Sequence, residues 1–261
     1  MSGLDAIINR KPPSLWELQQ LLRPLSSPVR TICISDTHNA DISALIPPGD
    51  ILIHAGDLTH SGTPSELQVT FDWLVSLPHE HKIVIAGNHD TYLQTVEGRS
   101  WVHTWRERGI IYLEDEAHTI QVRGRTFKIF GSPFTPQHGN GAFQYPRTGV
   151  TGTSSHILIT HGPPHGHLDL SGLGCRALLA RIWELCRTHP PVLHVFGHIH
   201  GGRGIENMPW NSAQGWFRTM HLLWAMLWGG RDNSIRTVAV NASVVGGPRD
   251  RDIRPPVVID I

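Results

Sequence analysis

Eight polar residues of metal-binding types follow five short apolar runs along the chain. They are Asp36, His38, Asp57, Asn88, His89, His161, His198 and His200. Carboxylate, amide oxygen and imidazole together suit borderline divalent metals such as Mn²⁺, Fe²⁺, Zn²⁺ or Ni²⁺. Thiolates are absent from the set, which disfavours a structural zinc site. In the Asp-x-His and His-x-His spacings both side chains lie on one side of an extended segment and can reach one ion.

The apolar runs that precede these residues have the length and β-branched content of strands. They cover 31–35, 51–55, 82–86, 156–160 and 192–196, and helical apolar spacing covers 64–77, 100–108 and 175–188. Further strands, more antiparallel in character, are predicted at 118–122, 126–131, 236–241 and 257–260. Alternating strands and helices indicate an α/β architecture, in which ligands gather at the carboxyl ends of strands. We expect two sheets packed face to face with helices outside.

The bulk composition narrows the class of protein. The chain of 261 residues has 22 basic and 22 acidic residues, a net charge of zero, and 18 histidines. A dedicated nucleic-acid binder usually shows a basic footprint, so the sequence gives no strong nucleic-acid signal. Three cysteines form no disulfide framework, and no apolar run reaches the ~18 residues of a membrane span. With no signal-peptide pattern either, a cytoplasmic location is expected.

Two segments stand apart from the alternating pattern. Residues 1–30 predict a short N-terminal helical arm, and 31–261 a single domain. A Trp-rich insertion at about 203–235 interrupts that domain. One interpretation of this segment is a helix or hairpin that packs on the body of the domain or on a dimer partner. The other is a substrate lid or an interfacial membrane contact.

The order of the strand-end motifs resembles that of the calcineurin-like metallophosphoesterases. The matching pieces are Asp36-Thr-His38, Gly56-Asp57, Gly87-Asn-His-Asp90, His161-Gly162 and Gly197-His-Ile-His200. Flanking residues, among them Val240-Asn-Ala-Ser243, are similar to the metallophosphoesterase-domain-containing branch, which includes brain-enriched vertebrate proteins with cyclic-nucleotide phosphodiesterase activity. The resemblance implies an α/β fold, a four-layer αββα sandwich of two mixed β-sheets flanked by helices.

The resemblance also implies a dinuclear centre holding two divalent metal ions. Asp36, His38 and His200 would hold the first metal, Asn88, His161 and His198 the second, and Asp57 would bridge them. His89 matches the family histidine that contacts the scissile phosphate and protonates the leaving group, and Asp90 could orient it. Paired cations polarise a phosphoryl group and lower the pKa of a bridging water.

The function predicted on this basis is metal-dependent hydrolysis of a small phosphodiester, with a cyclic nucleotide as the first candidate. Two alternatives stay open, a phosphatase acting on a small-metabolite phosphomonoester and a catalytically weak metal-binding scaffold. Three further residues are weaker candidates for substrate binding. His60 departs from the acidic or small residue expected after Gly56-Asp57, His165 follows His161 on a loop, and Tyr145 could stack on a ring of the substrate.

Overall fold

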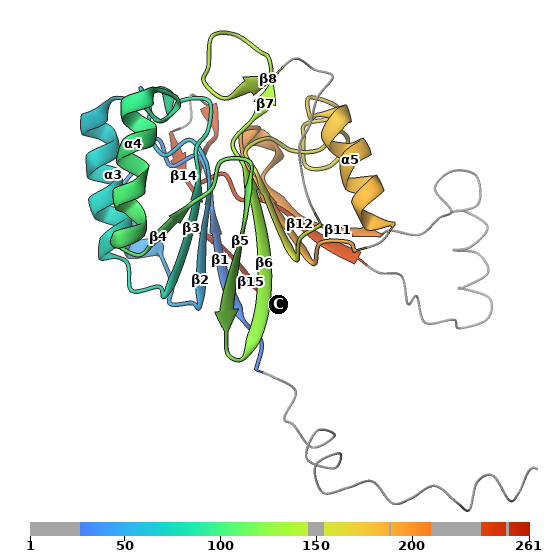
Figure 1. Ribbon diagram of the computed structural model, residues 1–261. Helices are drawn as coiled ribbons and strands as arrows, with labels where there is room; N and C mark the ends of the chain where they lie inside the picture. The colour runs from blue at the N-terminus through green and yellow to red at the C-terminus, as the bar shows by residue number, and fades with distance from the viewer. Residues whose placement is uncertain (1–26, 146–153, 188, 210–235, 249–250) are drawn as a thin grey trace, which may run out of the picture.

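The structure is a computed structural model that describes residues 27–145, 154–187, 189–209, 236–248 and 251–261 (Figure 1). Most of the predicted N-terminal arm and the Trp-rich stretch from 210 to 235 therefore lie outside the described residues. The described start of the predicted insertion, 204–209, is a strand of the main body.

The first sheet has five strands in the order β15-β1-β2-β3-β4. Their bounds are β1 Arg30–Ile34, β2 Ile51–Ala55, β3 His81–Ile85, β4 Ile110–Tyr112 and β15 Val257–Asp260. Strands β1 to β4 are mutually parallel, and β15 pairs antiparallel with the outer edge of β1. This placement differs from the sequence grouping, which put 257–260 with the second set of strands. Pairing with β1 covers an edge that would otherwise expose unpaired backbone groups.

The second sheet has six strands in the order β11-β12-β10-β9-β6-β5. Their bounds are β5 Glu116–Val122, β6 Arg125–Ser132, β9 Ile157–Thr160, β10 Leu193–Phe196, β11 Gly204–Pro209 and β12 Arg236–Asn241. The four central strands are parallel, and the outer strands β5 and β11 are antiparallel to their neighbours. Two small pairs complete the strands, β7 Thr135–Pro136 with β8 Gln144–Tyr145 and β13 Val245–Gly246 with β14 Asp252–Ile253.

The two sheets pack on each other through alternate residues of their strands. Cys33, Ile53 and Ile85 of the first sheet share a buried apolar cluster with Ile159 and Val195 of the second. Because side chains alternate across a strand, the intervening residues face outward toward helices. Burial of each large aliphatic side chain contributes about 1.5–3 kcal/mol, which makes this layer the main source of sheet-on-sheet stability.

Helices cover both outer faces and make the predicted four layers, as Figure 1 shows. Helices α3 Pro64–Ser76 and α4 Val96–Glu107 pack on the first sheet, and α5 Arg176–Cys186 packs on the second. Short turns of 3-10 helix lie at η1 Ser43–Leu45, η2 Thr91–Gln94 and η3 His200–Gly202. Helix α4 begins four residues before the predicted start because Thr95 caps it, accepting a hydrogen bond from the Gly98 amide at 3.0 Å. The expected αββα sandwich is confirmed.

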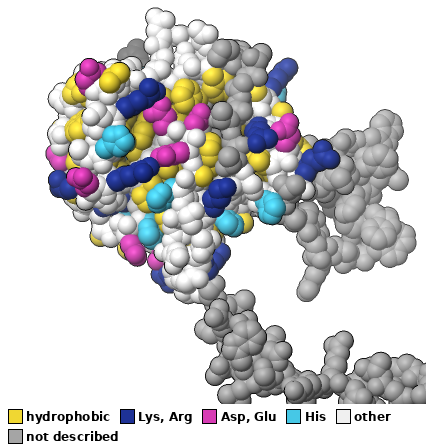
Figure 2. All heavy atoms as spheres, in the orientation of Figure 1, with side chains coloured by type: hydrophobic (Ala, Val, Ile, Leu, Met, Phe, Trp, Pro, Cys, Tyr) yellow, Lys and Arg dark blue, Asp and Glu magenta, His cyan; other side chains and the backbone are white. Residues whose placement is uncertain are grey.

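The surface carries charges of both signs. On the face shown in Figure 2, acidic and basic side chains are interspersed rather than gathered into a patch of one sign. None of the helices in the described ranges has the length and apolarity needed to cross a bilayer.

Candidate metal centre

The carboxyl ends of five parallel strands meet at one edge of the sandwich. Strands β1, β2 and β3 end there in the first sheet, and β9 and β10 end there in the second. Hydrogen bonds join the two sets of ends across the sandwich, since the Ala55 carbonyl accepts from His161 Nδ1 at 2.9 Å. All eight residues that the sequence analysis singled out lie on the loops that leave these ends.

One group of candidate ligands comprises Asp36, His38 and His200, whose ligand atoms lie within 4.8 Å of one another. Oδ1 of Asp36 is 3.3 Å from His200 Nε2. The carboxylate is fixed from the other side, because the backbone amide of His198 donates to it at 3.0 Å and the Ser243 hydroxyl donates at 2.9 Å. This oxygen-and-imidazole set fits a borderline divalent ion.

A second group comprises Asp57, His161 and His198, again with ligand atoms within 4.8 Å of one another. His161 Nε2 lies 3.3 Å from Asp57 Oδ2 and 2.9 Å from Asn88 Oδ1. Asn88 therefore adds its side-chain carbonyl oxygen to the possible metal ligands of this group. The set is the one that the resemblance assigned to the second metal, together with the predicted bridging carboxylate.

Asp57 lies between the two groups. Its Oδ2 atom faces His161 Nε2 at 3.3 Å and His38 Nε2 at 3.8 Å. Its Oδ1 atom accepts a hydrogen bond from the backbone amide of His89 at 2.8 Å, which fixes the rotation of the carboxylate. A single carboxylate oxygen thus faces histidines of both groups, as expected from the predicted bridging role of Asp57.

Backbone carbonyls orient two of the histidines for metal binding. His38 Nδ1 lies 3.1 Å from the Thr59 carbonyl oxygen, and His161 Nδ1 lies 2.9 Å from that of Ala55. Because a carbonyl only accepts, each Nδ1 carries a proton, and each Nε2 is the nitrogen that can offer a lone pair to an ion. Such second partners fix the tautomer and orientation of metal-binding histidines in proteins.

The pKa values of the acidic groups favour metal binding. Burial works to raise the pKa of Asp36, but its hydrogen bond with His200 and the charges of His161 and His200 hold that pKa well below its usual range. Burial also opposes ionisation of Asp57, and the charge and hydrogen bond of His161 outweigh it, so its pKa is lowered too. Both carboxylates are therefore anionic at neutral pH.

Four of the candidate ligands have a strained backbone. Asp36, His38, Asp57 and His198 have φ angles of 52°, 46°, 53° and 65°, in the left-handed region that non-glycine residues rarely adopt. Each such residue costs on the order of 1–3 kcal/mol and persists only where the surroundings enforce it. Four of the eleven non-glycine residues with positive φ in the described ranges are candidate ligands, which indicates that the loops here are shaped for the site.

Two glycines allow the loops to approach the carboxylates. A β-carbon on Gly197 would collide with the carboxylate of Asp36 and the side chain of Ser35, and one on Gly87 would collide with Asp57. Glycine precedes three of the candidate ligands in the sequence, and for these two the structure supplies the reason, which is a close approach to an acidic group.

His89 and His60 stand beside the first group. The His89 ring lies 4.7 Å from that of His38 and the His60 ring 6.0 Å from it, centroid to centroid, and both rings are at least partly exposed. His89 Nδ1 lies 2.7 Å from the His60 carbonyl oxygen. One ring nitrogen from each of His38, His60 and His89 also lies within 4.8 Å of the others, close enough for one ion to contact all three.

Asp90 is buried and holds the loops rather than the ring of His89. Its carboxylate accepts hydrogen bonds from the backbone amides of Gly87, Leu58 and Thr59 and from the Thr59 hydroxyl, at 2.7 to 3.1 Å. The orientation of His89 that was predicted for Asp90 is supplied instead by the His60 carbonyl. Asp90 ties the loop that carries Asp57 to the loop that carries Asn88.

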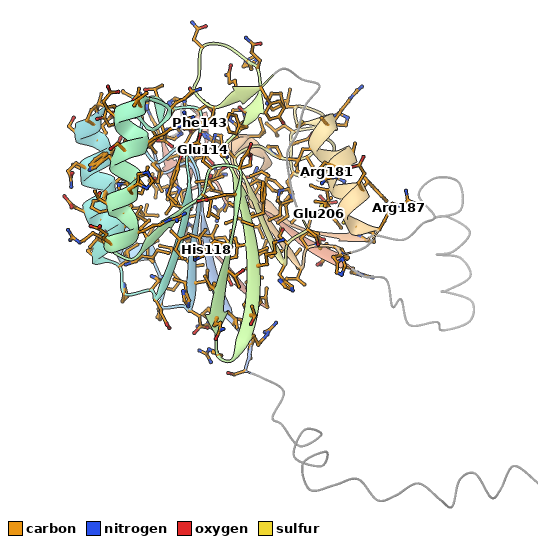
Figure 3. All side chains as sticks on the ribbon, viewed as in Figure 1. Glu114, His118, Phe143, Arg181, Arg187 and Glu206 are labelled. Atoms are coloured by element: carbon orange, nitrogen blue, oxygen red, sulfur yellow. The ribbon has the colours of Figure 1, made fainter. Side chains whose placement is uncertain are left out.

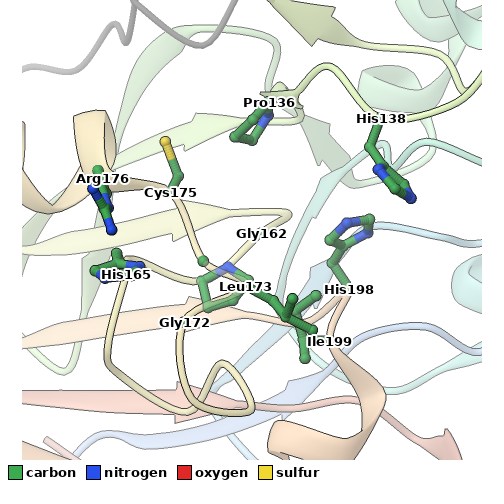
Figure 4. A pocket seen from close by; sticks show the side chains of 12 residues that line it. Pro136, His138, Gly162, His165, Gly172, Leu173, Cys175, Arg176, His198 and Ile199 are labelled. Carbon is green, nitrogen blue, oxygen red and sulfur yellow. The ribbon is translucent and has the colours of Figure 1, made fainter.

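A cavity of about 540 Å³ opens beside the second group (Figure 4). Its wall includes His198 of that group together with His165, one of the predicted substrate residues. Tyr145 is not part of this wall, and its hydroxyl contacts Cys175 Sγ at 3.1 Å. His60 lies on the other side of the centre, next to His89.

Two side chains at the centre lie in the matching segment Val240-Asn-Ala-Ser243, to which the sequence assigned no role in the site. Ser243 donates to Asp36, and Asn241 Oδ1 accepts from Ser243 Oγ at 2.8 Å. Asn241 is the last residue of β12 and Ser243 follows it, so the strand-end rule that found the other residues would also have selected them. Arg176 in the cavity wall gave no such signal because it begins a helix.

Comparison with known proteins agrees with this geometry. The model of the calcineurin-like phosphoesterase family matches residues 29–202. The chain is 34% identical over 264 residues to the human protein named metallophosphoesterase domain-containing protein 1, across 89% of this chain and 71% of that one. It is 44% identical over 258 residues to a probable rhamnogalacturonate lyase C of Emericella nidulans, across 89% of this chain. The chain spans only about a quarter (24%) of the length of that relative.

A solved structure shares the fold. The phosphopantetheinyl hydrolase of Mycobacterium tuberculosis aligns with a TM-score of 0.50 at 16% identity, over 86% of this chain and 92% of that one. The family match covers the strand ends of both sheets and every candidate ligand on them. The chain is therefore a member of the calcineurin-like phosphoesterase family.

Proposed function

We propose that the protein is a two-metal phosphoesterase that hydrolyses a small phosphodiester, and that cyclic nucleotides are the first substrates to test. The observation that carries this proposal is the position of Asp57 Oδ2, which faces histidines of both ligand groups. Asp36, His38 and His200 would hold one ion, and Asn88, His161 and His198 the other, with Asp57 shared. Two divalent ions at such a site polarise the phosphoryl group and supply a nucleophilic water at neutral pH.

His89 is the residue proposed to protonate the leaving group. Its Nδ1–H donates to the His60 carbonyl, which leaves Nε2 as the nitrogen free to meet the substrate. An imidazolium at Nε2 can bind a phosphate oxygen and then transfer its proton to the departing ester oxygen. Histidine is the side chain most often used for general acid catalysis near neutral pH.

The experiment is hydrolysis of bis(p-nitrophenyl) phosphate by purified protein reconstituted with Mn²⁺, Fe²⁺, Zn²⁺ or Ni²⁺ in turn. We expect turnover with at least one of these ions and a loss of about a thousandfold or more in the Asp57→Ala variant, because one substitution removes a ligand from both ions. His118→Ala is the matched control, since this histidine lies on β5 away from the strand ends (Figure 3).

The same preparation separates the alternatives. A panel of 2′,3′- and 3′,5′-cyclic nucleotides and small phosphomonoesters identifies the ester class that is cleaved. Cleavage of monoesters alone would replace the diesterase proposal by a phosphatase. Metal binding without turnover of any ester would contradict the enzyme proposal and leave a metal-binding scaffold.

A further inference from the structure

The cavity beside the second ligand group has two chemically distinct sides. Figure 4 shows His198 and His138 on one side and Arg176 and His165 on the other. Building on the proposed function, we propose that this cavity binds the leaving group of the phosphoester. We further propose that Arg176, with His165, recognises a second anionic group on that leaving group. The preferred substrate class is then a phosphoester that carries another phosphate or carboxylate beyond the one hydrolysed.

The cavity wall is held in place by one buried carboxylate. Asp169, which is 3% exposed, accepts hydrogen bonds from the backbone amides of Gly166, Gly172 and Gly174 at 2.8, 3.1 and 2.9 Å. Backbone bonds close the base of the same loop, from Cys175 N to the Pro163 carbonyl at 2.9 Å and from the His165 amide to the Cys175 carbonyl at 3.1 Å. The loop from 163 to 175 is therefore a closed structure rather than a loose connection.

The same loop is strained and tied to the metal centre. Leu168, Leu170 and Ser171 adopt φ angles of 50°, 52° and 67°, a conformation that side-chain-bearing residues avoid. The Asn241 side-chain amide donates to the carbonyl of Leu168 at 3.1 Å and to that of Ile199 at 2.9 Å. Because Ile199 separates His198 from His200, this amide fixes the cavity wall relative to both ligand groups. A fixed wall of this kind is the preorganisation that binding requires.

Among the residues that line the cavity, the permanently charged side chain is a cation, Arg176. Arg176, His138, His165 and His198 line it, and its twelve lining residues include no acidic side chain. The nearby carboxylate of Asp169 accepts from three amides, and its Oδ2 atom lies 3.9 Å from His165 Nδ1. A concave wall with basic groups and no acid attracts anions.

No contact within the described residues explains the position of the Arg176 side chain. It is exposed at the first residue of α5, and within the described residues it makes no salt bridge or hydrogen bond. A cation is electrostatically unfavourable at a helix N-terminus, so helix stability does not explain its placement. A guanidinium that faces a cavity binds phosphate or carboxylate through paired N–H donors.

The apolar residues of the cavity wall indicate what the middle part of the leaving group is like. Pro136, Pro163, Leu173 and Ile199 supply apolar surface between the two basic sides. A volume of about 540 Å³ falls within the range of small-molecule sites. A ring or short apolar spacer with an anion at its far end fits this distribution. With the scissile phosphate at the metal centre, that second anion reaches Arg176.

The test compares two substrates that differ by one anion. Adenosine 2′,3′-cyclic phosphate and its 5′-phosphorylated form are assayed with the Mn²⁺-reconstituted protein, and the ratio of their kcat/KM values is measured. We expect the wild type to favour the 5′-phosphorylated form by about tenfold or more, and Arg176→Gln to reduce that ratio about tenfold, the effect of one charge-assisted contact. Arg181→Gln is the control, because Arg181 lies on the same helix and pairs with Glu184 at 2.8 Å (Figure 3). A 5′-carboxylate analogue distinguishes a carboxylate preference from a phosphate preference.

Equilibrium binding makes the result independent of turnover. Isothermal titration calorimetry with adenosine 3′,5′-bisphosphate and adenosine 3′-monophosphate should give tighter binding of the bisphosphate, and Arg176→Gln should abolish the difference. Equal binding of the two ligands by the wild type, or an unchanged difference in Arg176→Gln, overturns the inference. Failure to hydrolyse any ester while the binding difference persists overturns the proposed function and leaves the anion site standing.

Discussion

At the scale of single residues, several candidate ligands are held by a second group, among them Asp36, Asp57 and His161. Ser243 and the His198 amide hold Asp36, and the His89 amide holds one oxygen of Asp57 while the other faces the two ligand groups. Such support lets anionic groups and imidazoles remain close together before any ion binds. The cost appears as backbone strain at Asp36 and Asp57.

The proposed role of His89 predicts a dependence on the leaving group. His89→Gln should slow hydrolysis of diesters with poor leaving groups by about 10²–10⁴, because their departure needs a proton. Hydrolysis of bis(p-nitrophenyl) phosphate should slow much less, since p-nitrophenolate leaves without one. The measurement is kcat for phenyl and p-nitrophenyl diesters side by side. An equal loss for both esters would assign His89 to phosphate binding alone.

His161 predicts how metal affinity depends on pH. Burial by itself would lower the pKa of His161, but the charge of Asp57 and their hydrogen bond raise it to about 9. A histidine must be neutral to bind a metal, so below that pKa a proton has to leave when the ion enters. Affinity for Mn²⁺ should therefore rise by up to about tenfold per pH unit between pH 6 and pH 9.

Calorimetric titrations of Mn²⁺ in buffers of different ionisation enthalpy check this prediction. Their comparison gives the number of protons released, which should approach one for the site that contains His161. An affinity independent of pH across this range would contradict the assignment of His161 as a ligand.

At the scale of elements, the carboxyl ends of parallel strands place the ligands, and glycine lets those ends approach. Gly197→Ala should weaken metal binding by about 10–100-fold, because a β-carbon there displaces Asp36, whose position the first ion needs. Gly162→Ala is the matched control, since its β-carbon would meet Thr135 and His198 only at 3.4 and 3.9 Å, which is ordinary contact.

Metal content after reconstitution, measured by atomic emission, compares the two glycine variants with the wild type. A normal metal content in Gly197→Ala would show that Asp36 can move without losing its ion, and would contradict the argument from close approach.

The positions of strands and helices could be predicted where the pattern that encodes them lies within a few neighbouring residues. The strands that carry the ligands occur within one residue of their predicted positions, because short β-branched runs bounded by polar residues have few alternatives. Strand β15 was placed in the wrong set of strands, because an isolated antiparallel strand does not encode which sheet edge it will cover. The predicted start of helix α4 lay too far along the chain, because the helix begins at a cap formed by Thr95 and not where the apolar spacing begins.

At the scale of the whole molecule, each ligand group takes residues from both sheets. Asp36 and Asp57 follow strands of the first sheet, whereas His161, His198 and His200 follow strands of the second. An ion bound to either group therefore links the two halves of the sandwich in addition to the apolar layer between them.

This arrangement predicts that metal binding stabilises the global fold. At a free Mn²⁺ concentration of about 100 times Kd, each site should add about 2.7 kcal/mol to the free energy of unfolding. Urea denaturation with Mn²⁺ and with EDTA measures the increment. Asp57→Ala should lose most of it, because the shared ligand serves both sites, and identical unfolding curves with and without metal would contradict a link between the sheets.

The residue types of the site, their order and the strands that end in them could be read from the sequence, since these depend on patterns within a few neighbouring positions. Tertiary structure decided what depends on distance between remote segments. In the folded chain Asp57 Oδ2 faces histidines of both groups, and the His60 carbonyl orients the His89 ring. Asp90 binds backbone amides of the loops instead of His89. Tertiary structure also brought Arg176 to the cavity beside His198. The physical reason is that hydrogen-bond partners and cavity walls form only when both sheets have packed.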